Sequence, residues 1–149
     1  MFCAGLTVYS PMKRHGCGPG KKVAIVGIGG LGHFALMFGK AMGAEVTAIS
    51  HSPNKKDDAK KLGADHFIDS SKKDFAKDHA FEFDLIVSTT DAGQKDFPMD
   101  DYLSYVLLRR MRLICRMLNI GGTFNQCGLP DQNLPSISPF TFISVRSPV

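Results

Sequence analysis

A Gly-x-Gly-x-x-Gly turn at residues 27–32 is the feature that most constrains the fold of this chain. An apolar run at residues 23–26 precedes it, and an Ala- and Met-rich helical pattern follows at residues 33–42. This order predicts a strand, a tight turn and a helix whose first N–H groups point at a bound pyrophosphate. The three glycines would permit the sharp turn, the close approach of a phosphate and the packing of helix on strand. We therefore expect a dinucleotide site rather than a plain strand–helix turn. Its expected residues are Gly27, Gly29, Gly30, Leu31 and Gly32.

The end of the second expected strand, residues 45–50, bears on which dinucleotide would bind. An Asp or Glu is usual at this place in NAD-binding folds, where it accepts hydrogen bonds from the ribose. This chain has Ser50, followed by His51, Ser52 and Lys55. Hydroxyls and a lysine would hold a 2′-phosphate that a carboxylate would repel, so these residues favour NADP over NAD. The simpler alternative makes Ser52 a helix N-cap and places the lysines on a solvated helix face. Both interpretations can hold together.

Composition excludes several other classes of protein. The 149 residues suit one globular domain, and the formal net charge of +4 suits an anionic cofactor without arguing for nucleic acid. The four cysteines form no Cys-x-x-Cys pair, which argues against a zinc ribbon and a disulfide scaffold. No apolar run could span a bilayer, and the start lacks the pattern of a secretory signal. We expect a cytoplasmic protein with neither membrane nor nucleic acid as a partner.

Strand and helix patterns alternate along the chain. This alternation predicts an α/β fold with a doubly wound parallel sheet of the Rossmann type. Thr89 and Thr90 leave the carboxyl end of the fourth expected strand, on the rim where cofactors lie. A polar loop with a helical turn is expected at residues 70–80. The expected strands after the first lie at residues 45–50, 65–69, 83–88 and 123–127, and the expected helices after the glycine turn at residues 33–42, 54–62 and 100–118, the last ended by Gly121–Gly122.

Five segments together resemble the zinc-dependent medium-chain alcohol dehydrogenases, in particular the NADP-dependent cinnamyl alcohol dehydrogenases. They are CAGLTVYSP at residues 3–11, GCGPGKKV at 16–23, GIGGLGH at 27–33, KLGAD at 61–65 and FDLIV at 83–87. The resemblance implies a reversible reduction of an aldehyde by NADPH to a primary alcohol. In that family a zinc ion polarises the carbonyl oxygen as a Lewis acid.

The resemblance also implies roles for single residues at the cofactor. Thr7 matches a residue near the nicotinamide end, and Thr89 and Thr90 lie where the family's fourth strand reaches the cofactor. His51 stands where the family commonly has an arginine. The residues implied at the 2′-phosphate are Ser50, His51 and Lys55.

Cys3 matches the family's last catalytic zinc ligand. A catalytic zinc needs about three protein ligands and an open position, and the other family ligands come from a catalytic domain with no counterpart in this sequence. We therefore expect no zinc on this chain, and Cys3 is alternatively a small buried hydrophobe. Residues 1–20 are expected to form a connector from the junction with a catalytic domain, and residues 21–149 an NADP-binding Rossmann domain.

Two departures from the family pattern stand out. Residues 105–116 look inserted, either extending a helix or forming an element for a membrane surface or an acidic partner. We favour a third interpretation, a translated intron without a selected role. The chain also leaves the pattern after residue 144, so the sheet is expected to be truncated at its last strand. That strand forms the family's dimer edge, which makes an oligomer doubtful.

Three functions are open at this point. The first is the cofactor-binding portion of an NADP-dependent alcohol dehydrogenase, which binds NADPH, turns over poorly and meets small aldehydes or alcohols. The second is a non-catalytic nucleotide-binding module or a partner of a full-length dehydrogenase. The third is an unrelated α/β protein such as a methyltransferase. Ser50 and Lys55 argue against the third, because a neutral ribose more often meets an acidic residue there.

Overall fold

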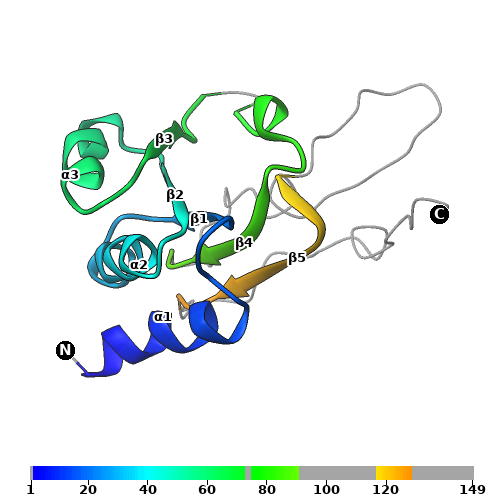
Figure 1. Ribbon diagram of the computed structural model, residues 1–149. Coiled ribbons are helices and arrows are strands. Elements are labelled where there is room, and N and C mark those ends of the chain that lie inside the picture. The colour runs from blue at the N-terminus through cyan, green and yellow to red at the C-terminus, as the bar shows by residue number, and fades with distance from the viewer. Residues whose placement is uncertain (1, 73–74, 91–116, 129–149) are drawn as a thin grey trace, which may run out of the picture.

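The computed structural model describes residues 2–72, 75–90 and 117–128, and its centre is a parallel sheet of five strands (Figure 1). The strand order is β3-β2-β1-β4-β5. This is the order of the doubly wound Rossmann fold, so the predicted α/β fold class is confirmed. The strands are β1 (Lys22–Val26), β2 (Glu45–Ser50), β3 (His66–Asp69), β4 (Phe83–Ser88) and β5 (Leu118–Gln126).

Three α-helices bury their apolar residues in one core on one face of the sheet. Figure 1 shows α1 (Phe2–Arg14) running beside α2 (Gly30–Ala41), with α3 (Lys56–Lys61) over the β3 edge. Short 3-10 turns, η1 (Pro53–Lys55) and η2 (Lys77–His79), complete the described helical segments. Helix α2 follows the glycine turn directly, so its first turn lies at the carboxyl end of β1.

Strand β1 is central and apolar because both faces of a parallel sheet are covered. Val23 and Ile25 belong to the core beneath the helices, whereas Ala24 and Val26 belong to a second core on the opposite face. All four are at most 3% exposed. The register of β1 with β2 and β4 therefore fixes where residue 27 leaves the sheet.

Helix α1 lies in the expected connector, where the sequence pattern indicated no helix. It contains Pro11, which has no N–H to donate to the carbonyl of Thr7 four residues earlier. The thiol of Cys127, just after β5, donates to that carbonyl at 3.5 Å. The first turns of α1 are thus tied to the far end of the described chain.

Strand β5 starts earlier than its sequence predicted. Gly121 and Gly122 do not end a helix but lie inside the strand, where Gly121 has a φ of +77°. The register with β4 shifts at this point, as in a β-bulge, which explains how a glycine pair fits a strand. Leu118 is a strand residue, so the predicted end of the helix at residues 100–118 is wrong. The rest of that helix and the segment 105–116 lie outside the described residues.

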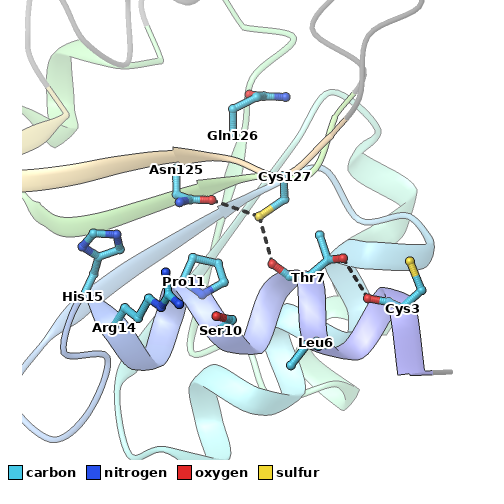
Figure 2. Close-up of a pocket in the computed structure, with 10 residues that line it drawn as sticks. All are labelled: Cys3, Leu6, Thr7, Ser10, Pro11, Arg14, His15, Asn125, Gln126 and Cys127. Carbon is cyan, nitrogen blue, oxygen red and sulfur yellow. Dashed lines mark hydrogen bonds between the residues drawn. The ribbon is translucent and has the colours of Figure 1, made fainter.

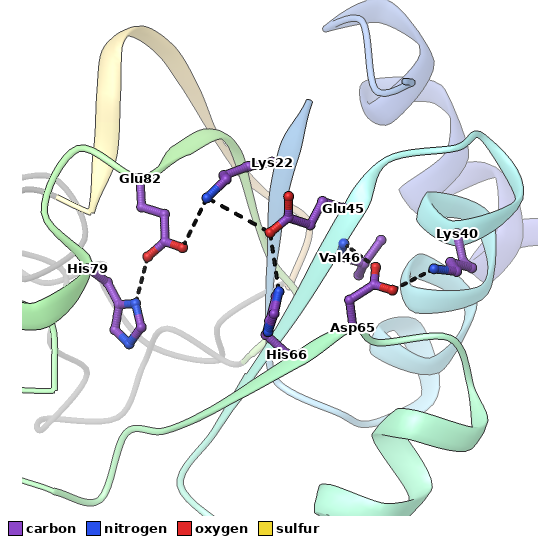
Figure 3. Close-up of polar contacts among 8 residues, drawn as sticks. All are labelled: Lys22, Lys40, Glu45, Val46, Asp65, His66, His79 and Glu82. Carbon is purple, nitrogen blue, oxygen red and sulfur yellow. Dashed lines mark hydrogen bonds and ion pairs between the residues drawn. The ribbon is translucent and has the colours of Figure 1, made fainter. Parts of the chain in front are cut away.

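The amino ends of the strands carry a row of ionisable side chains in contact with one another (Figure 3). Lys22 Nζ lies 3.5 Å from Glu82 Oε1 and 3.8 Å from Glu45 Oε1. Glu45 meets His66 at 3.2 Å, and Glu82 meets His79 at 2.6 Å. This row, named here the amino-end charge row, comprises Lys22, Glu45, His66, His79 and Glu82. Within the described part of the chain, no helix has the length and apolar character needed to cross a membrane.

Candidate cofactor site

The glycine turn has the close packing that its spacing predicted. Gly27 has a φ of +87°, a conformation that costs a glycine little. A Cβ on Gly32 would lie 2.0 Å from the carbonyl oxygen of Gly27. A Cβ on Gly27 would lie 2.5 Å from Cγ2 of Thr90. Two of the three motif glycines are therefore required by the packing of the turn itself.

Gly29 and Gly30 are different, because nothing lies within 4 Å of a Cβ built on either. Gly29 is the N-cap of α2, and no side chain caps the helix there. The first turn of α2 also holds no acidic residue. The first N–H groups of a helix have no acceptor inside it and attract anions. This uncapped, open turn fits the pyrophosphate of a dinucleotide.

Thr89 lies against the turn, as the resemblance implied, but its hydroxyl bonds to the chain's own backbone. Its single hydroxyl proton is shared between two carbonyl oxygens, with Oγ1 3.0 Å from Val26 O and 2.9 Å from Gly27 O. The backbone N–H of Thr89 also donates to Val26 O at 2.9 Å. Thr90 Oγ1 lies 3.2 Å from the hydroxyl of Ser88. The carboxyl end of β4 thus supports the turn.

The structure brings Lys55 to the same turn. Its Nζ donates to the carbonyl oxygen of Ile28 at 3.0 Å, across the gap between η1 and the end of β1. A cavity of about 430 Å³ opens here. Its lining residues are Ile28, Gly29, His33, Lys55, Asp58, Lys61 and Leu62.

The other residues expected at the 2′-phosphate do not line this cavity. Ser50 is 5% exposed, and its Oγ accepts a hydrogen bond from the backbone N–H of Ser52 at 3.2 Å. His51 is exposed. Ser52 occupies the N-cap position of η1 but makes no capping hydrogen bond through its side chain. The alternative interpretation therefore placed Ser52 at the N-cap correctly, but the capping hydrogen bond that it implied is not made.

Thr7 lies away from the glycine turn, in a second cavity of about 550 Å³ between α1 and β5 (Figure 2). Its Oγ1 donates to the carbonyl oxygen of Cys3 at 2.7 Å. Burial raises the pKa of the Cys127 thiol, which keeps its one proton for Asn125 Oδ1 at 3.1 Å and the carbonyl oxygen of Thr7 at 3.5 Å. The two cavities share no lining residue. The structure therefore does not bring Thr7 and the glycine turn into one pocket.

Cys3 is exposed on the first turn of α1, so it is not the buried hydrophobe of the alternative interpretation. Among residues 2–72, 75–90 and 117–128, no three His, Cys, Asp or Glu side chains converge where they could hold a metal ion. The described residues therefore do not fit a zinc site.

Sequence reasoning missed His33 as a residue of the first cavity. It follows the last glycine of the motif and lies one helical turn after Gly29. Its Nδ1 is 3.2 Å from the carbonyl oxygen of Gly29, and its backbone N–H donates to the same oxygen at 3.1 Å. Because residues four apart lie on the same face of a helix, the spacing of His33 from the N-cap Gly29 could have predicted that His33 lies at the first cavity.

Comparison with known proteins agrees with this geometry. Residues 30–148 match the family described as zinc-binding dehydrogenase. The chain belongs to this family. A probable formaldehyde dehydrogenase of Bacillus subtilis is 46% identical over 130 residues, which are 87% of this chain and 33% of that protein. An NADP-dependent alcohol dehydrogenase of Saccharomyces cerevisiae is 40% identical over 94% of this chain and 36% of its own length.

A solved structure supports the fold. CAD from Helicobacter pylori, complexed with NADP(H), superposes with a TM-score of 0.75 at 34% identity. The match covers 94% of this chain and 35% of that one. This chain thus spans about a third of the length of the curated relatives described above. The predicted family and the Rossmann fold are both confirmed.

Proposed function

We propose that this chain binds NADP(H) as the cofactor-binding portion of an alcohol dehydrogenase. The open, uncapped turn at Gly29 and Gly30 is the observation that carries the proposal, because it offers free N–H groups to a pyrophosphate. The NADP-dependent yeast relative and the NADP(H) complex of the Helicobacter pylori protein support the choice of cofactor. In this proposal residues 21–149 form the cofactor domain and residues 1–20 connect to it.

The preference for NADP rests on charge at the end of β2. Ser50 stands where an NAD-binding fold would carry a carboxylate, and Lys55 reaches the glycine turn from η1. Asp58 also lines the cavity, but Lys61 lies 3.8 Å from it and offsets its charge. The 2′-phosphate would meet Lys55 and the hydroxyl-bearing segment that begins at Ser50, with His51 at its exposed edge.

When bound, the cofactor supplies the hydride that interconverts an aldehyde and a primary alcohol. The chain's own residues position it: backbone N–H groups from Gly29 to Gly32 bind the pyrophosphate, and Thr90 lies on the rim beyond. Cys3 offers a single exposed thiol, and a zinc ion needs about three protein ligands. We therefore expect the chain to bind NADPH and to turn over poorly by itself.

A second candidate is a non-catalytic NADPH-binding module, favoured by the same exposed, single Cys3. The two candidates differ in aldehyde-dependent oxidation of NADPH, followed by its absorbance with and without added zinc. Turnover above the rate without protein supports the first candidate. NADPH binding without turnover supports the second.

Thermal unfolding of the full chain with NADPH and with NADH tests the cofactor proposal. A ligand that binds only the folded state raises the midpoint with concentration. We expect NADPH to raise it more than NADH, and a shift with neither would refute the proposal. The variant Ser50→Asp should weaken NADPH more than NADH, since it puts a carboxylate beside the 2′-phosphate. Equal losses for both cofactors would show that the ribose lies elsewhere.

A further inference from the structure

The carbonyl oxygens of residues 26–29, which enter and form the first part of the glycine turn, each accept a hydrogen bond. The oxygen of Val26 accepts from the N–H and the hydroxyl of Thr89, and that of Gly27 accepts from the same hydroxyl. Lys55 occupies the oxygen of Ile28. The oxygen of Gly29 faces two nitrogens of His33.

The pattern matters because the two polar groups of a peptide act oppositely on a phosphate. An N–H attracts a phosphate oxygen, and a carbonyl oxygen repels it. The turn therefore directs its acceptors toward the protein and leaves the open side of Gly29 and Gly30 to its donors. The peptide between Gly27 and Ile28 is the one whose orientation is least restricted by its own residues, since glycine allows a wide range of backbone angles.

Thr89 is the group that opposes this rotation. Its hydroxyl is the only donor to the oxygen of Gly27 among the described residues. It also lies 3.1 Å from where a Cβ on Gly32 would be, inside the turn. Without it, the Gly27 oxygen could turn outward to the phosphate side.

We infer that Thr89 is a positioning residue of the dinucleotide site, which acts through the Gly27 carbonyl rather than by touching the cofactor. The inference rests on the proposed function, since it assigns a means by which this turn holds a pyrophosphate. It differs from the role that the family resemblance implied, a contact with the cofactor.

The test compares Thr89→Val, which keeps the shape and removes the hydroxyl, with Thr89→Ser, which keeps the hydroxyl. Calorimetric titration of the full chain should show that Thr89→Val binds NADPH and NADH more weakly by the same factor, about tenfold for the loss of the one hydroxyl donor. The Ser variant should stay near the parent. Binding of 2′-AMP, followed by NMR, should not change, because that ligand has no pyrophosphate. If Thr89 served only stability, the affinities of Thr89→Val for NADPH, NADH and 2′-AMP would equal those of the parent at temperatures below its unfolding midpoint.

Thr47→Val is the control for the same substitution elsewhere in the sheet, because Thr47 is a buried threonine on β2, away from the turn, whereas Thr89 is half-buried just after β4. It should leave the affinity for both dinucleotides unchanged. Unchanged dinucleotide affinity in Thr89→Val would overturn the inference, as would an equal loss of 2′-AMP. If Thr89→Val and Thr89→Ala both fail to fold while Thr89→Ser folds, the hydroxyl serves the fold and the inference is also overturned. If the parent chain binds neither NADPH nor NADH, the proposed function fails before the role of Thr89 is reached.

Discussion

The two ends of the sheet satisfy their polar groups in opposite ways. At the amino ends, side chains pair with one another in the amino-end charge row (Figure 3), and the carboxylates of Asp65 and Asp84 accept from backbone N–H groups. At the carboxyl ends, side chains such as Thr89 and Lys55 pair with backbone carbonyls, and the N–H groups beside Gly29 are left open. Where both the donors and the acceptors have partners within the chain, no ligand is needed to satisfy them. Where only the carbonyl acceptors have partners, the open N–H groups can bind an anion.

The difference also separates stability from binding. Lys22 and Glu45 are each 44% exposed, and exposed ion pairs contribute little to the free energy of unfolding. The glycine turn instead packs so closely that added atoms must collide with backbone. Substitutions at the carboxyl ends should therefore have the larger effects. They should change the free energy of unfolding and the affinity for the cofactor, and these two effects can be separated.

The largest effect is expected from Gly32→Ala. Its methyl group would meet the carbonyl oxygen of Gly27, and no rotamer can relieve a clash of Cβ with backbone. Alanine favours a helix over glycine by about 1 kcal/mol, which the clash should exceed. We expect a net loss of about 3 kcal/mol in urea unfolding, together with loss of binding to both cofactors. A variant as stable as the parent would show that the turn is looser than described.

Gly29→Ala should separate binding from stability. The position has open space and a φ of −115°, which alanine adopts without strain. We expect the free energy of unfolding to change by less than about 0.5 kcal/mol. The affinity for NADPH and NADH should fall about tenfold, because the methyl group takes the space of the pyrophosphate. Unchanged affinity in calorimetry would place the phosphates elsewhere.

Asp65→Asn probes the amino ends, with a smaller effect that depends on pH. The hydrogen bond from Lys40 Nζ at 2.5 Å, and that from the N–H of Val46 at 2.9 Å, lower the pKa of the Asp65 carboxyl. The group therefore stabilises the fold above the ordinary carboxyl pKa and loses this contribution as pH falls through its lowered value. At pH 7 we expect a loss of about 1 kcal/mol, which vanishes in acid. Asp78→Asn, at an exposed position in η2, is the control, and equal effects of pH on both variants would contradict the assignment.

Glu45→Gln should have the smallest effect. It removes the charge that lies between Lys22 and His66, at 3.8 and 3.2 Å. Since both pairs are exposed, we expect less than about 0.5 kcal/mol in urea unfolding, and less again in high salt. Cofactor affinity should not change. A change in NADPH binding in this variant would mean that the two ends of the sheet are coupled, and would break the comparison.

The sequence predicted the carboxyl end of the sheet better than the segments that flank it. Strand periodicity and the glycine spacing are local signals, so β1, β2, β4 and the packing of Gly32 followed directly. Helix α1 was missed because Gly5 and Pro11 weaken its helical pattern, and tertiary contacts supply what the pattern lacks. The start of β5 was missed because a bulge at Gly121 reads as a helix stop.

Long-range hydrogen bonds were equally outside the reach of sequence patterns. Lys55 is 27 residues from Ile28, and Thr89 is 62 from Gly27, so no spacing rule joins them. The prediction of a 2′-phosphate at Lys55 rested on residue type, on the position after the second strand and on the family resemblance. The structure adds that its ammonium is already held at the turn.

The contact between Cys127 and Thr7 joins two residues that are 120 positions apart. Pro11 cannot donate the hydrogen bond that a helix would otherwise supply to the Thr7 carbonyl, and the thiol reaches that oxygen from just after β5. Because closing so long a loop is slow relative to local pairing, this contact should form late in folding, after α1 has packed its apolar residues beside α2.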